Sequence, residues 1–216
     1  MGGVRLIILF DLDGTLIDST EAILESFHNS FDHHNYLHVS DEKIKALIGH
    51  PLDIMYKELG VEEEKVWDFV QTYKEYYREI STQKTKLLPC AQEAIELASS
   101  FASLGIVTTK TGKYSQILME HFDLMDKFDV LIGREHVTHP KPDAEPIVRA
   151  LEAFDVSKKE VWMIGDTHMD MLCAQNAGVK SIGVTSGYEH EDELKKFTNI
   201  LFNDAFQAVS YLKSRK

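Results

Sequence analysis

The strongest hydrophobic pattern in the chain is a short, wholly apolar run at residues 6–10, which leads directly into Asp11-Leu12-Asp13-Gly14-Thr15. Five apolar residues are too few for a buried helix, and an unbroken run is typical of a strand buried on both faces of a parallel sheet. In open α/β sheets, reactive groups gather just beyond the carboxyl ends of such strands. The pattern therefore places Asp11 and Asp13 at a candidate site.

The segment that follows has helical periodicity throughout. Apolar residues three and four positions apart predict helices within about 16–31, 40–49, 51–59 and 62–81. Asp18, Ser19 and Thr20 are candidate N-caps for the first of them. Gly49 and Gly60 end two of these helices. Since no strand pattern occurs between about residues 18 and 83, we expect this block to be wholly helical.

From residue 87 onward, short apolar runs alternate with helical segments. The pattern predicts strands at 106–108, 130–132, 161–164, 181–184 and 199–202, and helices at 91–102, 113–121, 143–153, 169–177 and 205–212. Alternating strands and helices indicate βαβ units and a mainly parallel sheet. We therefore predict an α/β core formed by residues 1–17 and 84–216, with residues 18–83 inserted as an all-helical cap.

Composition and charge narrow the classes of function. Hydrophobic residues make up 44% of the 216 residues, enough for a sizeable core, and the formal net charge of −12 argues against nucleic-acid and anionic-membrane partners. No segment is long and apolar enough to span a membrane, and the run at 6–10 is too short for a signal peptide. We expect a cytoplasmic protein, a monomer or a homodimer, that binds neither nucleic acid nor membranes.

Asp11 and Asp13 lie two residues apart, and no basic residue occurs between Leu6 and Thr20 to neutralise them. Asp and Gly are ordinary turn residues, but in a simple turn these two carboxylates would repel each other without compensation. A bound Mg²⁺ would remove the conflict, because this ion takes oxygen ligands and is usually held by one or two carboxylates, waters and substrate phosphate. The motif thus favours a Mg²⁺ site over a simple turn.

Other strand ends and loops carry polar groups of a matching kind. Thr108 and Thr109 follow one strand, Lys141 lies between two prolines, and Asp166 and Asp170 follow another strand. Each has an ordinary structural explanation when taken alone, such as a helix cap, a turn or a surface lysine. Because the carboxyl ends of parallel strands meet at one edge of a sheet, a single site explains all of them.

In this order, Asp-x-Asp-Gly-Thr, a strand ending in Thr, Lys-Pro and Gly-Asp-x-x-x-Asp resemble the motifs of the haloacid dehalogenase superfamily, over nearly the whole chain. The helical insertion resembles the C1-type cap of that superfamily. The resemblance implies a Rossmann-like, mainly parallel sheet with an inserted helical cap, the activity of a phosphatase, and Mg²⁺ as cofactor. Opening and closing of the cap about residues 15–18 and 82–88 is a further hypothesis from this topology.

The resemblance also implies a role for each matching residue. Asp11 would be the nucleophile that forms an aspartyl-phosphate, and Asp13 would be the general acid and base. Mg²⁺ would be held by Asp11, the backbone carbonyl of Asp13 and Asp166, with Asp170 in support. The phosphoryl oxygens would be held by backbone amides after Asp11 and by three side chains: Thr108, Thr109 and Lys141.

Within the superfamily, the presence of Asp13 points to phosphoryl transfer, because the dehalogenases lack an acid–base aspartate at this position. The sequences around Asp11 and Thr108 resemble those of phosphoglycolate phosphatases, which usually have Asn in place of Thr109. We therefore expect a small phosphorylated metabolite, 2-phosphoglycolate, as substrate, with pyrophosphate as the alternative. A β-phosphoglucomutase-like activity is disfavoured, because Ile23 and Leu52 stand where those enzymes carry a cap histidine and an arginine.

The remaining candidate residues are histidines. His33, His34 and His38 have no nearby carboxylate cluster and indicate a solvated loop, although a metal site there is an alternative. His50 is a candidate for a substrate contact from the cap, or else a surface residue at a helix end.

Two other functional classes fit the sequence less well. A phosphoacceptor domain like those of response regulators would need neither Asp13 nor the insertion, and a non-catalytic binding module would not need to retain both aspartates.

Overall fold

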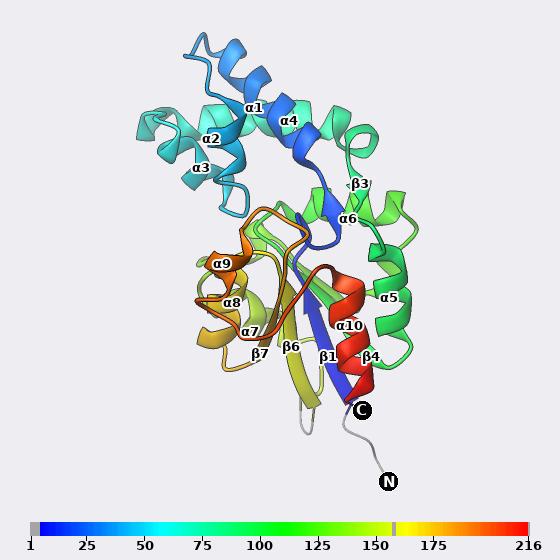
Figure 1. Ribbon diagram of the computed structural model, residues 1–216. Helices are drawn as coiled ribbons and strands as arrows, with labels where there is room; N and C mark the ends of the chain where they lie inside the picture. Colours follow the sequence, from blue (N-terminus) through cyan, green and yellow to red (C-terminus); the bar gives the residue numbers. More distant parts are fainter. Residues whose placement is uncertain (1–4, 157–158, 216) are drawn as a thin grey trace.

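A parallel sheet forms the centre of the molecule (Figure 1). The structure is a computed structural model that describes residues 5–156 and 159–215, and in this part of the chain six strands follow the order β5-β4-β1-β6-β7-β8. Every neighbouring pair is parallel, which confirms the mainly parallel α/β sheet predicted from the sequence. The strands are β1 (Arg5–Phe10), β4 (Ala102–Val107), β5 (Val130–Ile132), β6 (Lys159–Gly165), β7 (Lys180–Val184) and β8 (Leu201–Phe202).

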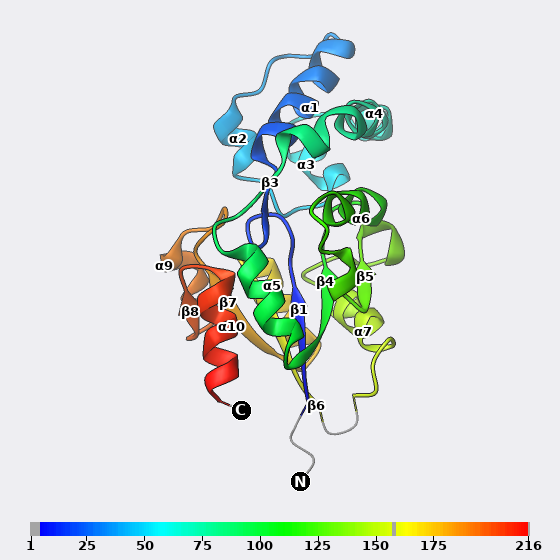
Figure 2. The same ribbon diagram turned by 90° about the vertical axis from the view of Figure 1, so that its right-hand side faces the viewer.

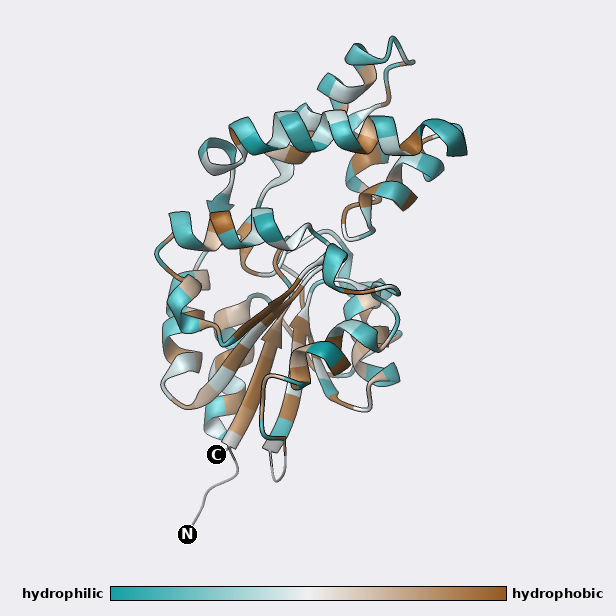
Figure 3. Cartoon of the chain, turned by 180° about the vertical axis from the view of Figure 1, so that it is seen from behind, coloured by the Kyte–Doolittle hydropathy of each residue, from teal (hydrophilic) through white to brown (hydrophobic). Residues whose placement is uncertain are grey.

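The side chains of the central strand β1 alternate between two buried faces. Ile8 and Phe10 belong to the hydrophobic cluster formed with α5 (Ala91–Ser99) and α10 (Ala205–Ser214). Ile7 and Leu9 belong to the cluster formed with α7 (Glu145–Leu151) and α8 (His168–Asn176), so helices cover both faces of the sheet (Figure 2). Figure 3 shows hydrophobic residues concentrated in the strands and hydrophilic residues on the outer helices. A strand covered on both faces needs apolar residues at every position, which explains the unbroken run at 6–10.

The helical insert stands above the carboxyl edge of the sheet (Figure 1). It has its own hydrophobic cluster, in which the rings of Phe31, Tyr56 and Phe69 contact one another. The expected helical cap between the first strand and the others is confirmed, and its first helix begins at Thr20, among the expected N-cap residues. Leu16 and Ile17, which precede it, belong to a core cluster of the sheet. The helices of the insert are α1 (Thr20–His33), α2 (Asp41–Lys45), α3 (Leu52–Glu58) and α4 (Val66–Lys84).

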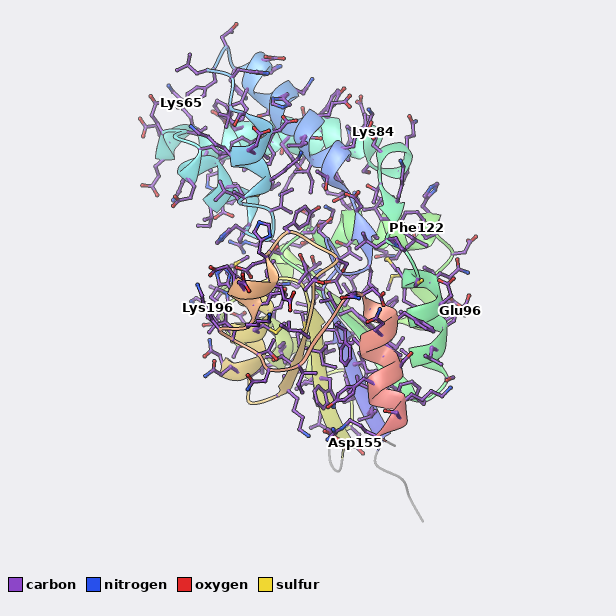
Figure 4. The ribbon with its side chains drawn as sticks, viewed as in Figure 1. Lys65, Lys84, Glu96, Phe122, Asp155 and Lys196 are labelled. Carbon is purple, nitrogen blue, oxygen red and sulfur yellow. The ribbon has the colours of Figure 1, made fainter. Side chains whose placement is uncertain are left out.

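Two short strands that the sequence did not predict join the insert to the core. β2 (Ile17–Asp18) pairs antiparallel with β3 (Lys86–Leu87), so the chain enters and leaves the insert through one two-stranded ribbon. Strands of two residues are too short for a period-two pattern to appear in the sequence. The ribbon occupies the segments about which cap movement is predicted. Beside it, Lys84 at the end of α4, labelled in Figure 4, contacts the carboxylates of Glu21 and Glu25 on α1 at 2.8 and 2.5 Å.

Helix α6 (Gly112–His121) packs against the insert as well as the core. The hydroxyl of Tyr114 on this helix donates a hydrogen bond of 3.2 Å to the backbone carbonyl of Lys74 on α4. A short helix, α9 (Glu191–Leu194), and 3-10 turns at Glu63–Lys65, Met125–Lys127 and Arg134–His136 complete the elements of the described chain. Among the residues that the structure describes, no helix combines the length and the apolar character that crossing a bilayer requires.

The buried position of Ile8 on β1 predicts a large loss of stability on truncation. Ile8 is fully buried at the centre of the sheet, so we expect Ile8→Ala to lower the free energy of unfolding by about 2–5 kcal/mol, through lost burial and the cavity that remains. Urea unfolding followed by circular dichroism measures this difference. The matched control is Val148→Ala, since Val148 is half exposed on α7, and a comparable loss in the control would contradict the assignment of the core.

Candidate active site

The polar residues predicted from the sequence converge at the carboxyl edge of the three central strands. Asp11 follows β1, Thr108 follows β4 and Asp166 follows β6, and these strands are direct neighbours in the sheet. Lys141 and Asp170 join them from the loop before α7 and from the first turn of α8. All five side chains are buried. The topology therefore brings together residues from position 11 to position 170 of the chain.

Three carboxylates and one lysine lie together at this edge. Oxygen atoms of Asp11, Asp166 and Asp170 all lie within 4.8 Å of one another. The Lys141 ammonium donates hydrogen bonds of 2.7 Å to Asp11, 2.6 Å to Asp170 and 3.2 Å to the carbonyl oxygen of Val107. With all groups ionised, this buried cluster carries three negative charges and one positive charge.

The pKa values of the cluster reflect this excess of negative charge. Burial raises the pKa of Asp11 to about 7, an effect that Lys141 opposes and Asp170 reinforces. Burial also raises the pKa of Asp166 well above its usual range, with further contributions from Asp11 and Asp170. Burial alone would lower the pKa of Lys141, but the adjacent carboxylates of Asp11 and Asp170 raise it overall, so this lysine stays charged.

Hydrogen bonds and close backbone packing fix Asp166. The Thr15 hydroxyl donates to its Oδ1 at 3.0 Å, and the backbone N–H of Tyr188 donates to its Oδ2 at 2.9 Å. The backbone on either side comes so close that a Cβ at Gly14 would lie 2.3 Å from Oδ2, and a Cβ at Gly187 would lie 1.9 Å from it. Gly14 also has a φ of +82°, which favours glycine. The glycine of the Asp-Gly-Thr motif is thus explained by packing as well as by backbone geometry.

Asp170 is oriented by the beginning of its own helix. Its Oδ2 accepts hydrogen bonds from the backbone N–H and the hydroxyl of Thr167, at 3.0 and 2.7 Å. Its Oδ1 remains for Lys141. This arrangement explains the spacing of the Gly-Asp-x-x-x-Asp motif, because the first aspartate directly follows the strand and the second caps the helix that comes next.

The donor set fits a hard divalent cation such as Mg²⁺. Carboxylate oxygens are the ligands that Mg²⁺ prefers, and a cation would balance the charge that Lys141 alone leaves uncompensated. In the residues that the structure describes, no other group of three potential ligand side chains is found. The histidines of the insert make other contacts: His34 stacks on the ring of Phe69 with centroids 4.2 Å apart, and its Nε2 lies 3.0 Å from the hydroxyl of Thr72.

Asp13 lies apart from this cluster and pairs with a lysine that the sequence analysis did not select. The Lys110 ammonium donates hydrogen bonds of 2.9 and 3.2 Å to the two carboxylate oxygens of Asp13, and the Ser19 hydroxyl donates to the same carboxylate. The side chain of Tyr77 on α4 covers Lys110, with the ring centroid 4.7 Å from the ammonium. Burial alone would lower the pKa of Lys110, but Asp13 raises it overall. The sequence feature that could have identified Lys110 is its position two residues after Thr108, at the same strand end.

The remaining predicted residues lie between the core and the insert. The Thr108 hydroxyl accepts a hydrogen bond of 3.2 Å from the backbone N–H of Lys110. The Thr109 hydroxyl donates to the backbone carbonyl of Gly49 at 2.7 Å, so it joins the core to the insert. His50, next to Gly49, is partly buried, and burial followed by the nearby His168 lowers its pKa.

A cavity of about 200 Å³ lies between the insert and the core. Asp13 and Lys110 line it from the core side, and His50 lines it from the insert. Ile23 and Leu52 also line this cavity with apolar surface. The other lining residues include the aromatic side chains Trp67, Tyr73, Tyr77 and Tyr114 and the basic side chains Lys74 and Arg134.

Comparison with known proteins assigns the family. The family model described as haloacid dehalogenase-like hydrolase matches residues 8–184. Pyrophosphatase PpaX of Bacillus velezensis is 32% identical over 204 residues, which cover 90% of this chain and 94% of that protein. A haloacid dehalogenase-like family hydrolase from Streptococcus pneumoniae has 25% identity and a TM-score of 0.87, over 96% of this chain and 98% of that structure.

A predicted phosphoglycolate phosphatase from Haemophilus somnus has the same fold, with a TM-score of 0.87 and 24% identity over 98% of this chain and 99% of that one. The chain belongs to the haloacid dehalogenase-like hydrolase family. The expected enzyme class, a phosphatase of this superfamily with a helical insert, is thereby confirmed.

The carboxylate cluster predicts that Mg²⁺ stabilises the protein. At about 100 times its Kd, a ligand that binds only the folded state adds about 2.7 kcal/mol, which corresponds to roughly 5–10 °C in Tm for a chain of this size. We expect Asp166→Asn to lose most of this Mg²⁺-dependent shift, whereas Asp126→Asn, which alters an exposed carboxylate, keeps it. Differential scanning calorimetry with and without Mg²⁺ measures the shift. An unchanged shift in Asp166→Asn would contradict the assignment of the metal site.

Proposed function

We propose that this member of the haloacid dehalogenase-like hydrolase family is a Mg²⁺-dependent phosphatase that hydrolyses a small phosphomonoester through an aspartyl-phosphate on Asp11. The observation that carries the proposal is the placement of Asp11. Its carboxylate is buried at the end of the central strand, lies 2.7 Å from the Lys141 ammonium, and belongs to a cluster that fits a divalent cation. A carboxylate fixed in this way next to positive charge is suited to attack a phosphoryl group whose own charge is neutralised.

In the first half of the reaction, an Asp11 oxygen attacks phosphorus and forms a new P–O bond. The bond between phosphorus and the leaving oxygen breaks, and its electron pair stays on that oxygen, which takes a proton from the Asp13 carboxyl group. In the second half, the Asp13 carboxylate takes a proton from water as the water oxygen attacks phosphorus, and the bond to Asp11 breaks. Asp13 lines the cavity between the insert and the core, into which the leaving group would depart.

The other residues hold the reactants. Lys141 keeps Asp11 in place and supplies positive charge next to the phosphoryl oxygens, and Thr108 presents a hydroxyl from the neighbouring strand. Asp11, Asp166 and the backbone carbonyl of Asp13 would hold Mg²⁺, with Asp170 in support. When bound, this ion would neutralise charge on the phosphoryl group and orient it for in-line attack.

Two substrates have support of different kinds. Several curated relatives at 29–33% identity carry the name pyrophosphatase, which supports pyrophosphate. Phosphoglycolate is supported by the sequence around the first two motifs and by the name of a structural relative. Both substrates have a small, negatively charged leaving group, and both would use the site in the same way. The apolar side chains of Ile23 and Leu52 at the cavity wall argue against a mutase.

The role of Asp11 predicts the outcome of a conservative substitution. We expect Asp11→Asn to lower kcat by about 10³-fold or more, because the amide is a poor nucleophile, while circular dichroism shows an intact fold. The measurement is Mg²⁺-dependent phosphate release from 2-phosphoglycolate, pyrophosphate, β-glucose 1-phosphate and a nucleotide. Asp126→Asn serves as the control, with activity equal to that of the wild type. Retention of activity by Asp11→Asn, or full turnover in excess EDTA, would overturn the proposal.

A further inference from the structure

Lys110 has no part in the roles proposed above, although it is buried next to a catalytic carboxylate. The side chains of Lys110 and Asp13 are only 9% and 12% exposed. Three parts of the fold meet at this ammonium: Lys110 comes from the loop after β4, Ser19 follows β2, and Tyr77 belongs to α4. Lys110 also lines the cavity, so its ammonium can contact a charged group that enters there.

The ion pair with Lys110 occupies the Asp13 carboxylate, which is the group that the leaving oxygen needs as its proton donor. Both carboxylate oxygens of Asp13 accept hydrogen bonds from Lys110, and Oδ1 accepts a further one from Ser19. Three of the roughly four lone-pair positions of this carboxylate are then filled, and Lys110 lines the same cavity as Asp13. A leaving oxygen that approaches from the cavity therefore competes with Lys110 for Asp13. Removing one member of a buried ion pair leaves the other charge uncompensated, which is strongly unfavourable. Lys110 therefore needs a second negative partner at the moment when Asp13 is released.

We propose that this partner is the substrate, and that Lys110 binds a second negative charge on the leaving group. The inference rests on the proposed function and narrows its substrate class to phosphate compounds whose leaving group carries a carboxylate or a phosphate near the scissile oxygen. Binding of such a substrate exchanges one ion pair for another, because Lys110 passes from Asp13 to the leaving group. Lys110 is thus a specificity-determining residue that also positions Asp13.

The other cations near the cavity are less well placed for this exchange. Lys141 already contacts Asp11 and Asp170. Arg134 donates to the carbonyl of Val137 and lies 3.8 Å from Asp53. Lys74 lines the cavity from α4, but no ion pair joins it to Asp13 in the described structure. Lys110 is the cation whose change of partner frees Asp13 directly.

The test compares two substrates that differ in one charge. Ethyl phosphate has a methyl group where 2-phosphoglycolate has a carboxylate, so the ratio of kcat/KM for 2-phosphoglycolate to that for ethyl phosphate measures recognition of the second charge. We expect a high ratio in the wild type and a ratio about 10- to 100-fold lower in Lys110→Met, from the loss of a hydrogen bond between charged groups. The decrease should come mainly from a higher KM for 2-phosphoglycolate. Lys110→Arg, which keeps the charge, should restore part of the ratio.

Two lysine variants serve as controls. Lys113→Met changes an exposed lysine three residues further along the chain and should leave the ratio unchanged. Lys74→Met tests whether any cation at the cavity wall suffices. A ratio that is unchanged in Lys110→Met, or that falls in Lys74→Met instead, would overturn the proposal, as would an equal preference for both substrates in the wild type. Equal losses for both substrates in Lys110→Met would indicate a merely structural role and overturn it too. Failure of the proposed function gives a different result, namely no Mg²⁺-dependent phosphate release from any substrate.

Discussion

The crowding of three carboxylates with only one ammonium, that of Lys141, is the physical constraint on which the site depends. Negative charge of this kind, buried at a strand end, is unfavourable in itself, and burial accordingly raises the pKa values of Asp11 and Asp166. The fold tolerates it because every carboxylate is held by hydrogen bonds, from Lys141, Thr15, Thr167 and a backbone amide. What remains is an excess of negative charge that a divalent cation would balance. The bound cation would then help to bind a phosphoryl group.

The topology of the sheet makes this crowding possible. Because β4, β1 and β6 are parallel neighbours, the residues after each strand arrive at one edge whatever their distance along the chain. The helical insert covers that edge and returns to the core through the ribbon of β2 and β3. It also covers a second charged pair of the core, Lys110 with Asp13, because Tyr77 on α4 lies over the Lys110 ammonium. The carboxylate cluster with Lys141 is suited to bind the phosphoryl group. The pair of Lys110 with Asp13 is suited to bind the leaving group.

The sequence could predict the features that depend on local pattern. The run at 6–10 indicated a central parallel strand, and the rule that parallel strands end at one edge placed Asp11, Thr108 and Asp166 together. Other features depend on packing between distant segments, which no local pattern records. The pair between Lys110 and Asp13, 97 residues apart, and the bond from Thr109 to the Gly49 carbonyl belong to this kind. The strands β2 and β3 were missed for another reason, since two residues are too few to show alternation.

The nucleophilic role of Asp11 is the central claim, and trapping the covalent intermediate tests it most directly. Acid quenching during turnover of the best substrate, followed by peptide mass spectrometry, locates any phosphoryl group attached to the chain. Our account predicts a phosphoryl group on Asp11, at a higher level in Asp13→Asn, because Asp13 is the base for the hydrolysis step. A phosphoryl group on another residue, or turnover with none on Asp11 in either protein, would contradict it.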